Sequence, residues 1–232
     1  MLFSALPASF IALSVVMLAF WAFSLHRVGV PFALPVGIAS AVALLTGALA
    51  SQGVFMDFDP LPRALPVFLL SIVAAILWGT RGKGRELTRL PMIWLIGFQS
   101  FRILVELAIH EAVAQGVAPP QMTWTGMNWD VLVGLSAIPV AALSARLPKW
   151  VLLVWNGLSL GLLANVVIVA ALSMPTPFQQ ITPDNVWIGA FPYIWLPQVL
   201  VTTAALGHVL VFLKLLRPLP ELASATPSIP AP

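Results

Sequence analysis

Seven long apolar runs dominate the chain. They lie near residues 6–25, 30–51, 64–80, 90–114, 129–147, 150–173 and 190–216, and turn-forming or charged residues separate them. Each run reaches or approaches the ~20 residues that an α-helix needs to cross the hydrocarbon core of a bilayer. None shows the alternation of apolar and polar residues that marks the strands of a membrane β-barrel. The pattern therefore predicts an all-α, polytopic transmembrane bundle of seven helices.

The basic residues between these runs predict the orientation of the bundle. If the connection at 81–89 faces the cytoplasm, alternation of the helices places nine of the eleven Lys and Arg residues on that side: Arg27, Arg81, Lys83, Arg85, Arg89, Arg146, Lys149, Lys214 and Arg217. Arg63 falls on the other side, and Arg102 lies within a run. Because cytoplasmic loops are enriched in basic residues, we expect the N-terminus outside and the C-terminus inside.

The composition agrees with a chain whose solvent is lipid. Apolar residues make up 60% of the 232 positions and charged residues 8%, whereas a soluble domain has about 25% charged residues. We expect a single transmembrane domain over residues 1–217 and a disordered cytoplasmic tail, rich in Pro, Ala and Ser, over 218–232. Met1-Leu2-Phe3 lacks the basic segment that opens a signal peptide, so the first run is expected to be retained as a helix.

Several kinds of site are disfavoured. The net charge of +3 comes with basic loops on one side of the membrane, so no nucleic-acid partner is expected. The chain has no Cys, which excludes disulfides and thiolate metal sites. His26, His110 and His208 fall at three different depths, which disfavours a shared metal ion, and His110 and His208 cannot hold one haem between them. We therefore expect no metal and no cofactor, and membrane lipids are the expected partners.

The fourth run concentrates the polar residues. Gln99, Arg102, Glu106 and His110 follow at spacings of three, four and four residues, which places them on one helical stripe about 16 Å long at 1.5 Å per residue. Arg102 is expected near the membrane centre, with Glu106 and His110 successively closer to the outside. Arg102 and Glu106 are spaced to form an ion pair. Two interpretations stay open: a buried pair that fixes helix packing, or a site for a ligand, an ion or a proton.

Two polar residues on neighbouring runs are further candidates. Asp130 opens the fifth run, where it either caps the helix N-terminus or shares an outer vestibule with His110. Asn165 continues the face of Gly157 and Gly161, a GxxxG pattern that favours close packing of two helices. Each residue thus has a structural and a functional interpretation.

The last run is interrupted near its outer end by Pro197. Proline has no N–H, so the carbonyl of Tyr193 is expected to be free beside Gln198. A broken helix next to polar side chains is one way in which transporters form a site, although a packing kink explains it equally. The residues predicted to bind a ligand or relay protons are Arg102, Glu106, His110, Asp130, Asn165 and Gln198.

Five groups of residues carry a resemblance to a known family. They are Gln99–Glu106 with His110, Met122-Thr123, Asn128-Trp129-Asp130, Asn156-Gly157-Leu158 with Asn165, and Phe191–Tyr193 with Trp195–Pro197. In these groups the chain resembles an uncharacterised family of bacterial polytopic membrane proteins of about seven helices, over roughly residues 90–217. The resemblance implies a multi-pass protein of the bacterial inner membrane and supplies no activity.

Three functions are compatible with this pattern. The leading hypothesis is a protein that binds or translocates a small molecule, an ion or a proton through a polar site in the outer half of the bundle, with Glu106 and His110 as proton relays. The second is an intramembrane enzyme acting on a lipid or lipid-linked substrate, with His110 as general base oriented by Glu106 or Asp130. The third is a non-catalytic subunit or assembly factor of a larger membrane complex. The sequence assigns no catalytic residue and leaves enzymatic activity undecided.

Overall fold

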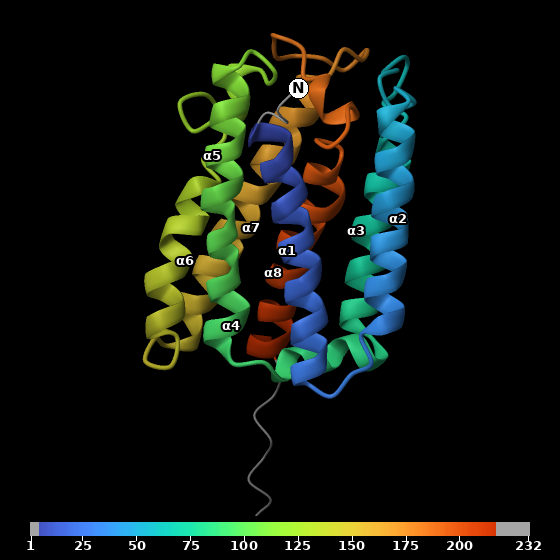
Figure 1. Cartoon of the computed structure of the whole chain (residues 1–232). Coiled ribbons are helices and arrows are strands. Elements are labelled where there is room, and N and C mark those ends of the chain that lie inside the picture. The colour runs from blue at the N-terminus through green and yellow to red at the C-terminus, as the bar shows by residue number, and fades with distance from the viewer. Residues whose placement is uncertain (1–4, 217–232) are drawn as a thin grey trace, which may run out of the picture.

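The structure is a computed structural model, and it describes residues 5–216. These residues form a helical bundle without a β-strand, which confirms the all-α prediction for this part of the chain (Figure 1). The α-helices are α1 (Ala5–Arg27), α2 (Ala33–Ser51), α3 (Leu65–Thr80), α4 (Met92–Gly97), α5 (Phe101–Ala114), α6 (Val131–Leu143), α7 (Lys149–Leu172) and α8 (Thr202–Leu216). Shorter 3₁₀ segments are η1 (Gly82–Arg89), η2 (Phe98–Ser100), η3 (Pro120–Met122) and η4 (Trp187–Gly189), and η5 (Leu196–Val201) is a π-helix. The tail predicted over 218–232 lies outside the described residues.

Several long apolar helices indicate an integral, multi-pass membrane protein. Five helical segments have the length and composition of a membrane span: Ala5–Arg27, Ala33–Ser51, Met92–Ala114, Lys149–Leu172 and Leu196–Leu216. The other two predicted runs form shorter helices. α3 has 16 residues and meets η1 at a bend of 71°, and α6 has 13 residues. The count of seven spans therefore stays a prediction.

Helix α6 is shorter than its apolar run because the chain turns at both ends. It begins after Asp130, and it ends at Leu143, where Arg146 N–H bonds back to the Leu143 carbonyl at 2.8 Å. Pro148 then precedes α7, and a residue before proline is disfavoured in a helical conformation. Residues 144–147 consequently belong to a turn rather than to the helix.

Helix α8 is the centre of the bundle. It packs against α3, α4 and α7, and most of its residues are buried. In Figure 1 it stands behind α1, with α5, α6 and α7 on one side and α2 and α3 on the other. Polar side chains on α8 and on the helices around it are therefore removed from the lipid-facing surface.

Two glycines allow close approaches around the fourth run. A Cβ at Gly134 of α6 would lie 2.7 Å from the Ile103 side chain and 2.9 Å from the Ile103 backbone nitrogen, so only glycine fits there without a shift. Gly207 of α8 packs in the same way against Phe98 and the Gln99 side chain. Glycine at these positions lets α6 and α8 lie directly against the rod formed by α4, η2 and α5.

The predicted close packing at Gly157 and Gly161 is wrong. Both glycines are exposed, and a Cβ at either one would meet nothing within 4 Å among the described residues. They face away from the neighbouring helices, because the buried face of α7 is the one that carries Leu152, Asn156 and Ser159. The GxxxG spacing was therefore not a guide to the packed face of this helix.

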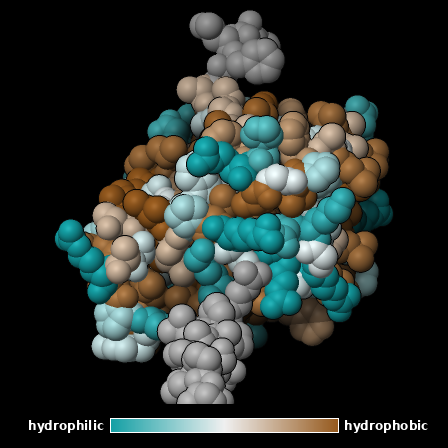
Figure 2. Space-filling view, turned by 90° about the horizontal axis from the view of Figure 1, so that it is seen from below, coloured by the Kyte–Doolittle hydropathy of each residue, from teal (hydrophilic) through white to brown (hydrophobic). Residues whose placement is uncertain are grey.

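The two ends of the bundle differ in their side chains. Connections α1–α2, α3–α4 and α6–α7 lie at the lower end in Figure 1, and α2–α3, α5–α6 and α7–α8 lie at the upper end. Seen from below, the lower face carries many hydrophilic side chains (Figure 2). The exposed basic residues of the lower connections are Arg27, Arg81, Lys83, Arg85, Arg89, Arg146 and Lys149.

Candidate polar site

Arg102 lies where α5, α6 and α8 meet. Its side chain is 2% exposed, its Nε is 2.9 Å from Oδ2 of Asp130, and its Nη1 is 3.3 Å from Nε2 of His208. The Nε contact is an ion pair without a well-aligned hydrogen bond. The predicted pairing of Arg102 with Glu106 is wrong, because no ion pair joins them in the described chain and each side chain turns to a different partner.

The glycine contacts explain why these partners reach Arg102. Gly134 follows Asp130 by one helical turn and brings the start of α6 against the backbone of Arg102 and Ile103. Gly207 precedes His208 and brings α8 against the Gln99 side chain, whose amide nitrogen donates to the Ala204 carbonyl at 3.1 Å. The capping role considered for Asp130 is wrong, since its side chain forms no cap hydrogen bond and instead faces the guanidinium.

The hydrogen bonds of His208 define its tautomer. Asn156 on α7 donates from Nδ2 to the His208 carbonyl at 3.0 Å, so its Oδ1 is the atom that lies 2.8 Å from Nδ1 of His208. That oxygen can only accept, and Nδ1 must therefore carry the proton. Nε2 is then bare and accepts from the Arg102 guanidinium. The arrangement favours a neutral histidine that is fixed between α5 and α7.

Glu106 turns toward the segment that joins α5 to α6. Oε1 accepts from the backbone N–H of Trp124 at 2.7 Å, and Oε2 accepts from Nδ2 of Asn128 at 2.8 Å. Asn128 is itself held, because Nδ2 also donates to the Met122 carbonyl at 2.8 Å and Oδ1 accepts from the N–H of Asp130 at 3.0 Å. Hydrogen bonds thus run from Glu106 through Asn128 to the backbone of Asp130, and the Asp130 side chain forms the ion pair with Arg102.

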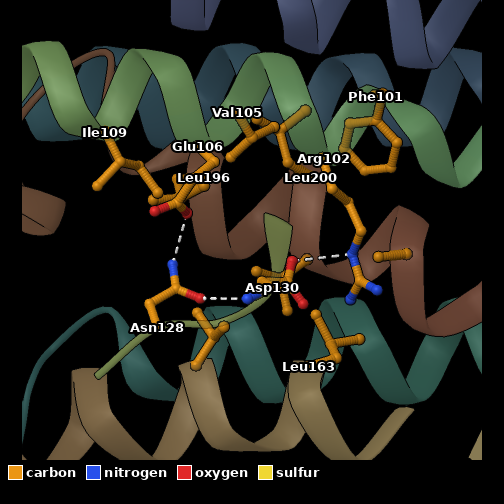
Figure 3. A pocket seen from close by; sticks show the side chains of 13 residues that line it. Phe101, Arg102, Val105, Glu106, Ile109, Asn128, Asp130, Leu163, Leu196 and Leu200 are labelled. Carbon is orange, nitrogen blue, oxygen red and sulfur yellow. Dashed lines mark hydrogen bonds and ion pairs between the residues drawn. The ribbon is translucent and has the colours of Figure 1, made fainter. Parts of the chain in front are cut away.

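These residues border a small, partly open cavity (Figure 3). Arg102, Glu106, Asn128 and Asp130 provide its polar wall, and the other walls are apolar side chains of α5, α7, η5 and α8. The cavity volume is about 30 Å³, whereas one water molecule needs roughly 10–15 Å³ measured in this way. The space fits one or two water molecules or a bare ion and is too small for an organic solute.

Buried polar atoms without partners lie in the same region. Within residues 5–216, Nη2 of Arg102, Oδ1 of Asp130 and Oε1 of Gln99 have no hydrogen-bond partner. An unsatisfied buried donor or acceptor costs about 1–3 kcal/mol, and more when the group is charged. One donor and one acceptor on the polar wall of the cavity match the hydrogen-bonding capacity of water or of a small ion with its water.

The charges of the site are unequal in number. Arg102 is one cation, and Asp130 and Glu106 are two carboxylates, so the fully ionised cluster carries a net charge of −1. Ionisable groups in a membrane span are costly and mark ion or proton pathways. The excess carboxylate is the group able to accept a proton or to attract a cation. Within residues 5–216 there is no cluster of three or more His, Cys, Asp or Glu side chains arranged to hold a metal ion.

Three of the predicted residues lie apart from this cavity. His110 is exposed and stacks on Trp124, with 4.6 Å between ring centroids. Asn165 donates to the Met127 carbonyl at 2.7 Å, which links α7 to the α5–α6 connection. Gln198 accepts a 2.5 Å hydrogen bond from Thr46 of α2, on another face of the last helix. The structure therefore brings together Arg102, Glu106 and Asp130 and separates the other three.

The predicted free carbonyl near Pro197 is also wrong. The Tyr193 carbonyl accepts from the N–H of Leu196 at 2.9 Å. The chain winds as a π-helix from Leu196 to Val201, and this wider turn accommodates the missing proline N–H. The carbonyl therefore offers no open ligand position.

The sequence interpretation missed His208 and Asn156 as members of the network. His208 lies twelve residues from Leu196, and Arg102 lies twelve residues from Ala114, each counted from the upper end of its helical segment. Because the two residues are equally far from the upper ends of their helical segments, they are expected at the same depth in the membrane. Counting His208 from the lower end of its segment instead places it too close to the lower side. Asn128 is indicated in the sequence only by the family resemblance, and nothing in its spacing indicates that it binds Glu106.

Comparison of the chain with protein-family models, with curated proteins and with solved structures finds no match. The resemblance to a bacterial membrane-protein family stays a prediction.

Proposed function

We propose that this chain binds or translocates a small ion, a proton or a small molecule through the site formed by Arg102, Asp130 and Glu106. The observation that carries the proposal is a buried charged cluster whose unpartnered polar atoms lie beside a cavity. A cluster that served only helix packing would gain stability from having every polar atom paired. Among the three kinds of ligand, the volume of about 30 Å³ favours a proton or a small ion in this conformation.

The proposal includes seven membrane spans, with the N-terminus outside and the C-terminus in the cytoplasm. The exposed basic residues at the lower end of the bundle support this orientation (Figure 2). The upper end, with the site beneath the α5–α6 connection, would then face the outside. The bacterial inner membrane is proposed from the resemblance alone. Anionic membrane lipids are the partners that the basic lower face would attract.

An intramembrane enzyme is less well supported. The general base considered for it, His110, forms no hydrogen bond with Glu106 or Asp130 in the described chain, since both carboxylates are engaged elsewhere. His110 lies on the surface of the bundle against Trp124. No observation separately favours a non-catalytic subunit.

Proteoliposomes provide the test of the proposed function. The purified chain is reconstituted with a pH-sensitive dye inside, and proton or alkali-cation flux is measured under an imposed gradient. Glu106→Gln is expected to abolish the flux, because it removes the excess carboxylate while keeping the size of the side chain. Glu111→Gln is the matched control, since Glu111 is an exposed carboxylate on the same helix and bonds only to Gln115 in this structure. Equal flux through both variants, or no flux of the wild type above empty liposomes, would contradict the proposal.

A further inference from the structure

The segment between α5 and α6 covers the cavity from the upper end of the bundle. We call residues 115–129 the lid. It leaves α5 at Gly116, whose φ of +70° only glycine adopts readily, and it carries the buried side chains of Gln121, Met122, Thr123 and Asn128. Asn128 is the lid residue that lines the cavity. Met122 is 1% exposed and belongs to the main apolar core, so the lid is packed into the bundle beside the site.

The Glu106 carboxylate holds the lid from below through two hydrogen bonds. Both of its lid partners are donors, the Trp124 N–H and the Asn128 amide nitrogen. In Figure 3 the Asn128 nitrogen points at Glu106 and its oxygen at Asp130. The amide cannot be turned round to offer its oxygen to Glu106, because that turn would break its bonds to the Met122 carbonyl and the Asp130 N–H. The ionised form of Glu106 offers each donor a carboxylate oxygen, whereas a proton on either oxygen competes with the donor at that oxygen.

The other side-chain hydrogen bonds between the lid and the rest of the described bundle come from amide groups, and one of them, from Gln115 at the start of the lid, goes to the exposed Glu111 carboxylate at 2.7 Å. Gln121 donates to the Pro183 carbonyl at 2.6 Å, and Asn165 donates to the Met127 carbonyl at 2.7 Å. The lid itself contains no acidic or basic residue.

The charged and titratable groups around Glu106 are few. Arg102, His110 and Glu111 share its helix, Asp130 opens α6, and His208 faces Arg102 from α8. His110 stacks on Trp124 of the lid, and the exposed Glu111 accepts from Gln115. Within the membrane runs, α1 and α7 carry no acidic or basic residue between their ends. Since Arg102 already faces Asp130 and His208, Glu106 is the buried carboxylate that accepts hydrogen bonds from the lid and has no ion-pair partner among the described residues.

We propose that Glu106 is the proton-binding residue of the site and that its uptake of a proton releases the lid. The inference rests on the proposed function and names the proton as its ligand. The proton adds to a carboxylate oxygen, and the resulting O–H faces an N–H donor, so one of the two lid bonds is lost. The lid then opens the cavity toward the upper end of the bundle. Loss of the proton restores both bonds and closes it.

Cysteine labelling measures the opening directly. The chain has no native Cys, so Met122→Cys places a single thiol on the buried side of the lid. Its reaction with a water-soluble maleimide reports the open state, and Gln180→Cys, at an exposed position of the other upper connection, corrects for the pH dependence of the reagent. Val105→Cys, on the cavity wall, provides a second buried thiol if Met122→Cys does not fold.

In this background Glu106→Gln is expected to speed labelling at least about tenfold, because a hydrogen bond to a charged group is lost. Asn128→Asp is expected to do the same by placing two carboxylates together. The double variant Glu106→Gln with Asn128→Asp should return the rate toward that of the wild type, since the introduced amide donates to the introduced carboxylate and still accepts from the Trp124 N–H.

The labelling rate of Met122→Cys with Glu106 and Asn128 unchanged, corrected by Gln180→Cys, should rise as the pH falls.

We call the release of the lid by protonation of Glu106 the latch. The outcomes test the latch separately from the transport function. Unchanged labelling in Glu106→Gln, or a double variant as reactive as the single ones, overturns the latch even if Glu106→Gln abolishes flux. Faster labelling in Glu106→Gln with recovery in the double variant supports the latch even if wild-type liposomes conduct nothing, and in that case only the proposed transport fails. A corrected wild-type rate that does not change with pH overturns Glu106 as the proton-binding residue.

Discussion

At the scale of single residues, the site depends on how Arg102 distributes its hydrogen bonds. The guanidinium faces an acid on α6 and a neutral histidine on α8, and it leaves Nη2 without a partner beside the cavity. The Arg102 cation thus links three helices: α5, which carries it, and α6 and α8, which carry its partners. The stability of this arrangement depends on pairing, because a buried charge without its partner is costly.

Arg102→Met tests this dependence on pairing. It leaves the carboxylate of Asp130, 14% exposed, without its cation, and we expect a loss of about 3–5 kcal/mol in the free energy of unfolding. Adding Asp130→Asn removes the stranded charge and should restore more than half of that loss. Unfolding in detergent, followed by circular dichroism, measures both.

The exposed pair of Arg63 and Asp57 is the matched control for this experiment. Its side chains are 60% and 42% exposed, so Arg63→Met should change stability by less than about 1 kcal/mol. A double variant at Arg102 and Asp130 that is no more stable than Arg102→Met would show that the loss does not come from the unpaired carboxylate.

At the scale of the helices, the sequence identified the polar stripe but not its partners. Spacings of three and four residues were sufficient to place Arg102 and Glu106 on one buried face of one helix. The same spacing suggested that they pair, yet their side chains diverge because α6 and the lid supply better placed groups. The glycines show the same limit, since a GxxxG spacing is equally compatible with a packed and an exposed face. Which face of a helix is packed depends on the neighbouring helices, and the periodicity of one helix does not identify those neighbours.

Gly134 and Gly157 form a matched pair for testing this packing. Both lie within helices, but only Gly134 contacts a neighbouring backbone. Gly134→Ala should destabilise the protein by about 1–3 kcal/mol, since the added methyl forces α6 away from Ile103. Gly157→Ala meets no atom and should stabilise it by roughly 0.5–1 kcal/mol through the better helix propensity of alanine. Thermal unfolding of the two variants in the same detergent compares them, and a shift of equal sign in both would contradict the packing described here.

At the scale of the whole molecule, the polar site lies between two unlike ends. Above it, the lid and the α7–α8 connection close the bundle through hydrogen bonds between uncharged groups and through the two lid bonds to Glu106. Below it, an apolar cluster that includes Leu95, Ile96, Leu152 and Leu210 separates His208 from the basic lower face. Access from above requires only that a loop moves, whereas access from below requires that packed helices separate. The asymmetry favours exchange of the ligand with the upper side in this conformation.

The predicted count of seven spans can be tested at the short helix α6. If α6 crosses the membrane, residues before and after it lie on opposite sides, and if it does not, they lie on the same side and the count of seven spans fails. Met127 and Ala145 are exposed residues on either side of α6. In a chain without native Cys, Met127→Cys and Ala145→Cys each give a single thiol for labelling in intact cells with an impermeant maleimide. We expect Met127→Cys to react before permeabilisation and Ala145→Cys only after it. Reaction of both from outside would remove α6 from the membrane, and the reverse pattern would invert the orientation that the basic residues predict.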